Sequence, residues 1–178
     1  MSAMVETPGN IVLIGPMGAG KSTVGRLLAA RLGCAFTDTD HLIEDRCGAD
    51  IPWIFDVEGE AGFRLRETHI LETLQDQTGL VIATGGGIVT QPGNLPLLKS
   101  LGQVIYLTAS IEQLFSRTRK DRRRPLLQVA DPRAQVEALF RARDPIYREV
   151  ADWVLDTSGR GSKWVAQRIF EARGAQVS

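Results

Sequence analysis

Hydrophobic residues in this chain follow two alternating patterns, which predict strands and helices in turn. Continuous apolar runs that end in glycine, serine or aspartate are typical of parallel strands covered on both faces, and they span residues 10–15, 34–38, 79–87, 102–110 and 151–158. Apolar residues at helical spacing fall within residues 21–32, 41–47, 60–77, 92–100, 111–117, 132–148 and 162–173. The alternation predicts an α/β fold of βαβ units with a parallel sheet, in which ligands bind at the C-terminal ends of the strands.

Length and composition favour one globular domain. The chain has 178 residues, of which 43% are hydrophobic, and we expect residues 1–178 to form a single domain with an ordered core at about 9–173. The 21 basic residues are balanced by 21 acidic ones, which argues against nucleic-acid binding. The sequence has neither a membrane-span-like run nor a signal-peptide pattern. Because the only two cysteines lack metal-ligand spacing, we expect a cytoplasmic protein without membrane contact.

The most charged segment is "RKDRRRPLL", residues 119–127. Such a run is compatible with a nucleic-acid patch, a solvated loop or part of a catalytic site. Arginine supplies most of the positive charge of the chain, because the only lysines are Lys21, Lys99, Lys120 and Lys163. Arginine can bind phosphate or carboxylate through two parallel hydrogen bonds, so this composition favours small anionic ligands.

Residues 15–23, "GPMGAGKST", match the phosphate-binding pattern G-x-x-x-x-G-K-[ST] between a predicted strand and a predicted helix. The glycines let backbone N–H groups face a phosphate, and the helix N-terminus adds its positive dipole end. Lys21 can bridge the terminal phosphates, and Ser22 can supply a hydroxyl to Mg²⁺. The candidate ATP-binding residues of this loop are Gly18, Ala19, Gly20, Lys21, Ser22 and Thr23. A glycine-rich turn without a ligand is the alternative, and the flanking strand and helix argue against it.

Two aspartates, Asp38 and Asp40, follow the second predicted strand in "FTDTD". If the chain stays extended there, both side chains point the same way, toward the ligand-binding edge. One carboxylate could then bind the metal, for which Asp38 is the best candidate, while Asp40 accepts a hydrogen bond from a substrate hydroxyl. The alternative is a capping role, with Asp40 as the N-cap of the next helix. Asp156, after "WVL", is a rival metal ligand.

The segment "DVEG", residues 56–59, formally matches the D-x-x-G signature of GTP switches. It follows no apolar strand, and the chain has no N-K-x-D-like motif that would read guanine. We therefore predict a turn between two helices at this position.

One arginine falls on an apolar stripe. In the predicted helix 132–148, Arg143 continues a stripe formed by Val136, Leu139 and Phe140. A buried guanidinium needs an anionic partner. For a lone arginine, a structural Asp or Glu is the more common partner, so a ligand-binding role needs support from the rest of the site.

Arg64 borders the apolar stripe of the predicted helix 60–77, where Glu60 and Glu67 are possible ion-pair partners at i−4 and i+3. The sequence "TGGG", residues 84–87, ends a predicted strand and offers backbone N–H groups at the same edge. Two arginines together with these donors would suit a substrate that carries a carboxylate.

The chain resembles the shikimate kinase family from its phosphate-binding loop almost to its end. The motifs that carry the resemblance are "GPMGAGKSTVGR", "DTD", "GEAGFR", "ATGGG", "RRPLL" and "RDPIY", in that order. The resemblance implies a three-layer P-loop kinase fold, similar to nucleoside monophosphate kinases, with a five-stranded parallel sheet and a mobile lid. It also implies transfer of the γ-phosphoryl group of ATP to the 3-hydroxyl of shikimate, with Mg²⁺ as cofactor, in aromatic amino-acid biosynthesis.

The resemblance also implies roles for individual residues. Shikimate would be bound by Asp40, Arg64, Gly86 and Arg143, with Gly85 and Gly87 as further candidates in the same glycine loop. Ser22 and Asp38 would hold Mg²⁺, while Lys21 and Arg124 would stabilise charge on the transferring phosphoryl group. Arg117 and Arg160 would flank the adenine of ATP.

Residues 118–131 have the length and polarity of a lid that closes over both substrates and keeps water out. Within it we expect Arg124 to reach the phosphates, and Lys120, Arg122 and Arg123 to be solvated charges. A kinase of another small polyol such as gluconate is the alternative within the same fold. A non-catalytic nucleotide switch or nucleic-acid binder is a more distant one. We expect the protein to be a monomer.

Overall fold

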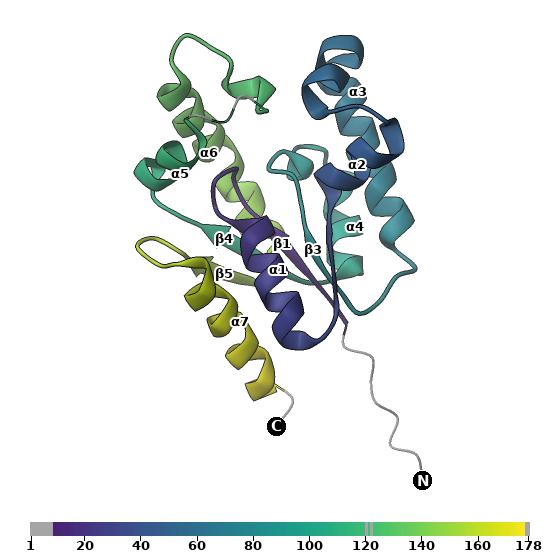
Figure 1. Ribbon diagram of the computed structural model, residues 1–178, viewed down its shortest axis with the longest axis vertical. Coiled ribbons are helices and arrows are strands. Elements are labelled where there is room, and N and C mark those ends of the chain that lie inside the picture. The colour runs from purple at the N-terminus through teal and green to yellow at the C-terminus, as the bar shows by residue number, and fades with distance from the viewer. Residues whose placement is uncertain (1–8, 120, 122, 177–178) are drawn as a thin grey trace.

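A computed structural model describes residues 9–119, 121 and 123–176 and contains one parallel sheet (Figure 1). Its strands are β1 (Asn10–Ile14), β2 (Ala35–Asp38), β3 (Leu80–Ala83), β4 (Gly102–Thr108) and β5 (Trp153–Asp156). They form a 5-stranded sheet in the order β2-β3-β1-β4-β5, in which every neighbouring pair is parallel. The predicted strands and the five-stranded parallel sheet are confirmed.

Helices cover both faces of this sheet. They are α1 (Lys21–Leu32), α2 (Thr39–Cys47), α3 (Ile51–Leu74), α4 (Asn94–Leu101), α5 (Ile111–Thr118), α6 (Pro132–Val150) and α7 (Ser162–Gln176). Two short 3-10 helices, η1 (Ile88–Thr90) and η2 (Pro125–Leu127), lie in the connections. Helices α1 and α7 pack side by side in front of the sheet in Figure 1, whereas α4 and the C-terminal part of α6 pack behind it. This arrangement is the three-layer fold that the family resemblance implies.

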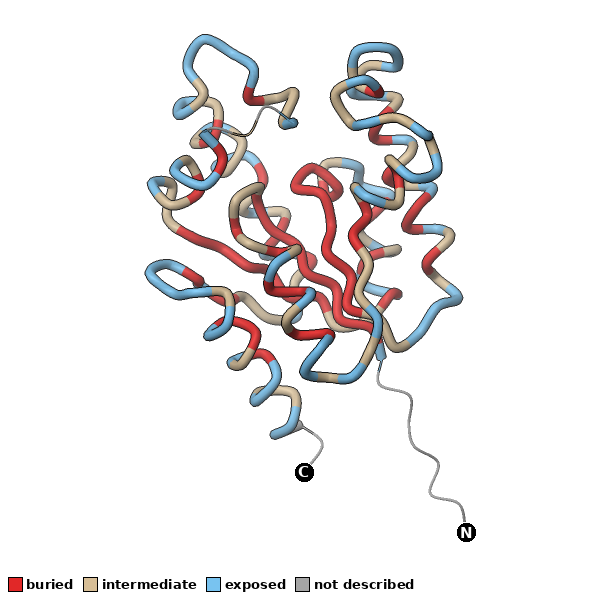
Figure 2. The backbone as a smooth tube through the Cα atoms, in the orientation of Figure 1, coloured by how far each residue is buried: buried red, intermediate tan, exposed pale blue. Residues whose placement is uncertain are grey.

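The core consists of two apolar layers separated by the sheet. Because side chains alternate along a strand, Ile11 and Leu13 of β1 pack toward α1 and α7, and Val12 and Ile14 pack toward α3 and α4. Figure 2 shows the central strands as an almost continuous buried band. Burial on both faces explains why the strands read as unbroken apolar runs in the sequence.

The C-terminal ends of the parallel strands lie at one edge of the sheet, and the loops that leave them carry most of the candidate residues. β1 leads through residues 15–20 into α1, β2 leads directly into α2, and β3 leads into the glycine loop 84–87. Helix α3 rises above this edge on one side, and the segment between α5 and α6 rises above it on the other (Figure 1).

The structure corrects the prediction around residues 51–59. Residues 51–58 were expected outside the helix, but α3 begins at Ile51, where Asp50 caps it by accepting a hydrogen bond from the Trp53 N–H at 3.0 Å. The predicted turn at residues 56–59 is reduced to a break at Gly59, which has φ 72° and ψ 178° within the long helix. Glycine adopts this conformation without the steric cost that other residues incur. Elsewhere the helix boundaries differ from the predicted ones by a few residues.

Among the helices of the described residues, none combines the length and the apolar character that crossing a membrane requires.

Candidate active site

The loop between β1 and α1 has the conformation of a phosphate-binding loop. Gly18 and Gly20 have φ of 85° and 89°, values that favour glycine, and Gly20 directly precedes the first turn of α1. The Lys21 ammonium group folds back over the loop and donates to the carbonyl oxygens of Gly15 at 2.6 Å and Pro16 at 2.9 Å. The amine is therefore held at the centre of the loop that would surround a phosphate.

Burial, and secondarily the positive charge of Arg124, lowers the pKa of Lys21 to about 7, although Asp40 and Asp38 oppose the shift. Whether the Lys21 amine is protonated therefore depends on the charges of the groups beside it. A bound phosphate would restore the charged form, because an adjacent anion favours the ammonium ion.

We therefore expect ATP binding to take up protons from solution at pH 8. The unliganded Lys21 amine is largely neutral there and becomes protonated beside the phosphates, so ATP affinity should fall by up to about tenfold per pH unit as the pH rises above 7. Calorimetry in two buffers of different ionisation enthalpy measures the proton uptake. In a Lys21→Arg variant, whose side chain stays charged, the uptake should disappear. An equal uptake in both proteins would contradict this assignment.

Asp38 is the last residue of β2, and its side chain accepts three hydrogen bonds. Its side chain caps α2 by accepting hydrogen bonds from the backbone N–H groups of Asp40 at 2.9 Å and His41 at 3.3 Å. Its other oxygen accepts a hydrogen bond from the Ser22 hydroxyl. The predicted capping alternative placed Asp40 at the N-cap, which is wrong, because the helix starts at Thr39 and Asp38 is the cap.

The pair formed by Ser22 and Asp38 fits a Mg²⁺ ion. Both side chains offer oxygen atoms, the ligands that Mg²⁺ prefers, and they line one pocket together with the phosphate-binding loop. Mg²⁺ usually takes one or two protein oxygens and completes its shell with phosphates and water. Among the described residues, no cluster of three or more His, Cys, Asp or Glu side chains could hold a metal ion. Asp156, the rival candidate, is at the end of the edge strand β5 and accepts a hydrogen bond from the Ser158 N–H.

Asp40 also reaches the site, although the chain does not stay extended as the prediction assumed. It lies in the first turn of α2, and the helix directs its carboxylate toward the glycine loop, where Oδ1 is buried and has no hydrogen-bond partner among the described residues. Burial raises the pKa of Asp40, as does the nearby Asp38, while Arg124 and Lys21 lower it. A buried carboxylate oxygen without a partner is poised to accept a hydrogen bond from a ligand.

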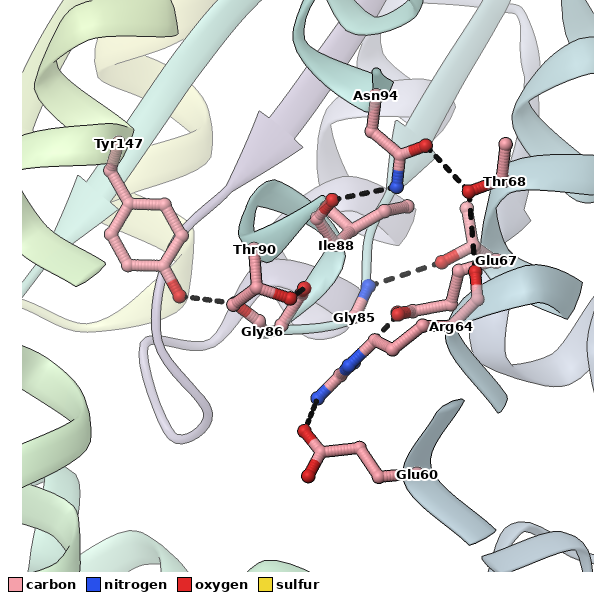
Figure 3. Close-up of polar contacts among 12 residues, drawn as sticks. Glu60, Arg64, Glu67, Thr68, Gly85, Gly86, Ile88, Thr90, Asn94 and Tyr147 are labelled. Atoms are coloured by element: carbon pink, nitrogen blue, oxygen red, sulfur yellow. Dashed lines mark hydrogen bonds and ion pairs between the residues drawn. The ribbon is translucent and has the colours of Figure 1, made fainter. Parts of the chain in front are cut away.

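Arg64 of α3 and Arg143 of α6 reach the glycine loop from different elements, and both are buried. Arg64 forms the predicted ion pairs, with Glu67 at 2.6 Å and Glu60 at 3.1 Å (Figure 3). For Arg143 the predicted structural partner is not found: within the described part of the chain, no carboxylate forms an ion pair with it. A buried guanidinium without a carboxylate partner favours an anionic ligand.

The glycine loop between β3 and η1 fits tightly among these charged groups. A Cβ atom at Gly85 would lie 2.7 Å from Asp40 Oδ1, and one at Gly87 would lie 2.3 Å from the Arg64 guanidinium. Only glycine leaves room for those side chains at these positions. The N–H of Gly85 donates to the Thr39 hydroxyl at 3.1 Å, whereas the N–H groups of Gly86 and Gly87 have no acceptor among the residues that the structure describes.

The basic run contributes two arginines to the site. Arg124 pairs with Asp121 at 3.0 Å and faces the phosphate-binding loop. Arg123 is exposed, as predicted for a solvated charge, and both Glu44 carboxylate oxygens accept hydrogen bonds from it at 2.8 Å, so it also links the run to α2. Lys120 and Arg122, predicted to be solvated as well, lie outside the described residues.

The two arginines predicted to flank adenine lie near the phosphate-binding loop. Arg117 donates to the Gly18 carbonyl at 2.9 Å. Arg160 lies over the Trp164 ring at 4.4 Å, in the turn that leads into α7, and Ser162, the first residue of α7, lies near Gly20. Arg117 lines the pocket of the phosphate-binding loop.

Three adjoining pockets join these groups into one site. The first contains both buried arginines and the glycine loop, the second contains Ser22, Asp38 and Glu44, and the third contains the phosphate-binding loop and Arg117. Asp40 and Arg124 line all three. The site therefore offers a phosphate end, an anion-binding end, and a carboxylate and an arginine at their junction.

Sequence reasoning missed several residues of this site. Glu67 was considered only as a partner of Arg64, but it is fully buried and lines the pocket that contains both buried arginines and the glycine loop, here called the anion pocket. Burial raises the pKa of Glu67 to about 7, although Arg64 opposes the shift. Phe55 and Phe63 form an aromatic wall, with ring centroids 4.9 Å apart. Tyr147 reaches the glycine loop from α6 (Figure 3). The sequence feature that could have identified Tyr147 is its position one helical turn after Arg143, in "RDPIY".

Comparison with known proteins places the chain close to one group of enzymes. The shikimate kinase family model matches residues 17–173. The shikimate kinase of Halorhodospira halophila is 54% identical over 97% of this chain and 98% of its own length. The solved structure of shikimate kinase from Acinetobacter baumannii in complex with shikimate is 49% identical, covers 96% of both chains and superposes with a TM-score of 0.93. The Aquifex aeolicus shikimate kinase structure is 33% identical, covers 94% of this chain and 98% of its own, and has a TM-score of 0.82.

Proposed function

This chain belongs to the shikimate kinase family, and from that premise we propose how its residues carry out the reaction. The enzyme transfers the γ-phosphoryl group of ATP to the 3-hydroxyl of shikimate, giving shikimate 3-phosphate and ADP. The observation that carries this function is the buried Arg143, which lacks a carboxylate partner in the described part of the chain, in a pocket that adjoins the phosphate-binding loop. It provides a place for the carboxylate of an acceptor next to the phosphates of a nucleotide.

At the donor end, residues 15–23 bind the phosphates of ATP through backbone N–H groups and the N-terminus of α1. Lys21 and Arg124 approach the terminal phosphates and offset the charge that spreads over the γ-phosphoryl oxygens during transfer. Arg117 and Arg160 flank the adenine. Ser22 and Asp38 would hold Mg²⁺, which would supply positive charge beside the phosphates.

At the acceptor end, Arg64, Arg143 and the N–H groups of the glycine loop bind the carboxylate of shikimate. This fixes the ring so that a hydroxyl group reaches Asp40 at the junction of the pockets. Asp40 accepts a hydrogen bond from that hydroxyl, orients it toward the γ-phosphorus and takes its proton as the new bond forms.

The segment 118–131 acts as a lid in this proposal. Arg123 and Arg124 line the pockets of the site, Leu127 packs into the core, and the Arg123–Glu44 ion pair joins the segment to α2. Closure over both substrates excludes water, to which the γ-phosphoryl group would otherwise be lost. We also propose that the chain is a single-domain monomer in the cytoplasm with Mg²⁺ as its cofactor.

The function is tested by a panel of acceptors with ATP and Mg²⁺: shikimate, gluconate and nucleoside monophosphates. We expect ADP release that depends on shikimate and is near background with the other acceptors. The gluconate alternative gains no support from the relatives described above. If ADP release does not depend on shikimate, the proposed function is wrong. Turnover of gluconate would establish the alternative, a gluconate kinase.

Replacing Arg143 with methionine should raise the KM for shikimate about tenfold to a hundredfold, because a charge-assisted pair of hydrogen bonds is lost. The KM for ATP should change less than about twofold. The unliganded variant should be no less stable to heat than the wild type, because the wild-type protein buries a cation that lacks a carboxylate partner.

The matched control for this change is Arg141→Met on the same helix, which removes an exposed arginine paired with Glu137. Steady-state kinetics and thermal melting with and without shikimate measure both effects. Equal changes in the two KM values would show that Arg143 does not belong to the acceptor pocket.

A further inference from the structure

Tyr147 connects α6 to the glycine loop. Its side chain is fully buried, and its hydroxyl donates a hydrogen bond to the carbonyl oxygen of Gly86. Figure 3 shows Tyr147 and Arg64 approaching the loop from opposite sides. Arg143 lies one helical turn earlier on α6, and its positive charge is close enough to oppose the effect of burial on the pKa of the Tyr147 hydroxyl. The phenolic oxygen is therefore bonded to the loop and lies near a buried arginine of the same pocket.

The hydrogen bond fixes the direction of the peptide group between Gly86 and Gly87. No peptide bond of the described chain is cis, so the Gly87 N–H points away from the Gly86 carbonyl and therefore away from Tyr147. That N–H has no acceptor among the described residues. Gly87 lies against the Arg64 guanidinium, and Gly86 lies close to that of Arg143, so the peptide stands between the two arginines.

A hydroxyl is needed here because glycine does not hold its own backbone in one conformation. Three consecutive glycines have no side chains to restrict rotation, and the peptide between Gly86 and Gly87 could turn over at little steric cost. A hydrogen bond to the carbonyl opposes that rotation and also strengthens the N–H of the same peptide as a donor.

Tyr147 is itself held in place. Its ring packs on Tyr106 with centroids 4.8 Å apart, and the Tyr106 hydroxyl donates to Asp144 at 2.6 Å. Burial raises the pKa of Tyr147 to about 12, so its hydroxyl remains a donor throughout the physiological range. The two tyrosines thus pack against each other and are both buried, but the Tyr147 hydroxyl donates to the glycine loop and the Tyr106 hydroxyl donates to Asp144.

We propose that Tyr147 is a positioning residue for shikimate. By holding the Gly86 carbonyl, it directs the Gly87 N–H toward the carboxylate that lies between Arg64 and Arg143. This inference rests on the proposed function, since it assumes that shikimate occupies the pocket between Arg64 and Arg143. It assigns to Tyr147 a role in acceptor binding and none in nucleotide binding.

The test compares Tyr147→Phe with Tyr106→Phe, because each removes one hydroxyl from the same buried stack. Tyr147→Phe should raise both the KM and the calorimetric Kd for shikimate about threefold to tenfold, the effect of one hydrogen bond. Its KM for ATP and its kcat should stay within about twofold of wild type. Tyr106→Phe should leave all of these values within about twofold. Equal changes in the two variants, or an equal change in both KM values, would overturn the proposal.

A second measurement uses the wild-type protein and does not depend on folding of a variant. In a ¹⁵N-glycine-labelled sample, the assigned Gly87 amide resonance should move downfield when shikimate is added, because a hydrogen bond to the carboxylate forms. A Gly87 resonance that does not move, in a sample that binds shikimate, would also overturn the proposal. If the wild-type enzyme neither binds nor phosphorylates shikimate, the proposed function itself fails, so the two failures are distinguishable.

Discussion

Replacing Asp40 with asparagine should lower kcat for shikimate phosphorylation by about 10²-fold to 10⁴-fold, the range of a lost general base. The change keeps the shape of the side chain and removes its negative charge and proton affinity. Asp40 lies where the phosphate and anion pockets meet, and its buried Oδ1 has no partner among the described residues, so the reacting hydroxyl is its natural ligand. The KM values should change much less than kcat, because Asp40 acts on the reacting group.

The control for Asp40→Asn is Asp45→Asn, an exposed carboxylate on the same helix, which should leave kcat within about twofold of wild type. An assay that couples ADP release to NADH oxidation measures both variants. If Asp40→Asn keeps more than half of the wild-type kcat, Asp40 is not the base, and the orientation of the hydroxyl must come from the glycine loop and the arginines.

The pH profile provides an independent check on Asp40. Burial, and secondarily Asp38, raises the pKa of Asp40, and a base works only in its deprotonated form. Activity should therefore be lost as the pH falls through that raised pKa, at a higher pH than an ordinary aspartate would give. Asp40→Asn should remove this acid limb from the profile of kcat/KM for shikimate. An acid limb that persists unchanged would belong to another group.

Replacing Arg124 with alanine should lower kcat by about 10²-fold to 10³-fold, the typical effect of removing one group that stabilises transition-state charge. Arg124 faces the phosphate-binding loop near Lys21, and its charge is strong enough there to lower the pKa of that lysine. Arg124→Lys should recover only part of the activity, because an ammonium group cannot reproduce the two-pronged contact of a guanidinium.

Arg123→Ala is the matched control in the basic run. It breaks the ion pair with Glu44, but the arginine side chain is 64% exposed and such pairs contribute little, so kcat should fall less than about threefold. Stopped-flow and steady-state assays of both variants separate the phosphoryl-transfer step from product release. Equal losses in the two variants would mean that the run acts through lid position rather than through one phosphate contact.

Much of the fold could be predicted because its signals are local. A strand buried on both faces appears as a continuous apolar run, and the phosphate-binding loop has a fixed pattern between a strand and a helix. The helix at residues 51–58 was not predicted because Gly59 was interpreted as the end of a turn. Gly59 is instead a break inside a longer helix that Asp50 caps. The cap at Asp38 was misplaced because the strand passes into α2 with no loop between them.

Contacts between distant residues were harder to predict. The charged partners of Arg64 lie within one helical turn and could be named in advance, but the ion pair of Arg123 with Glu44 joins positions 79 residues apart. The bond from Tyr147 to Gly86 spans 61 residues. No periodicity in the sequence encodes such separations, which arise only when the sheet order brings the helices over a common edge.

The buried Arg143 also affects how this enzyme will behave in the laboratory. A desolvated guanidinium beside backbone N–H groups that have no acceptor among the described residues should bind simple oxyanions of suitable size. Sulfate, phosphate or citrate in a buffer should therefore compete with shikimate, and the apparent KM should rise with the concentration of these salts. Kinetic constants for this enzyme are comparable only when measured in buffers with weakly binding anions such as chloride.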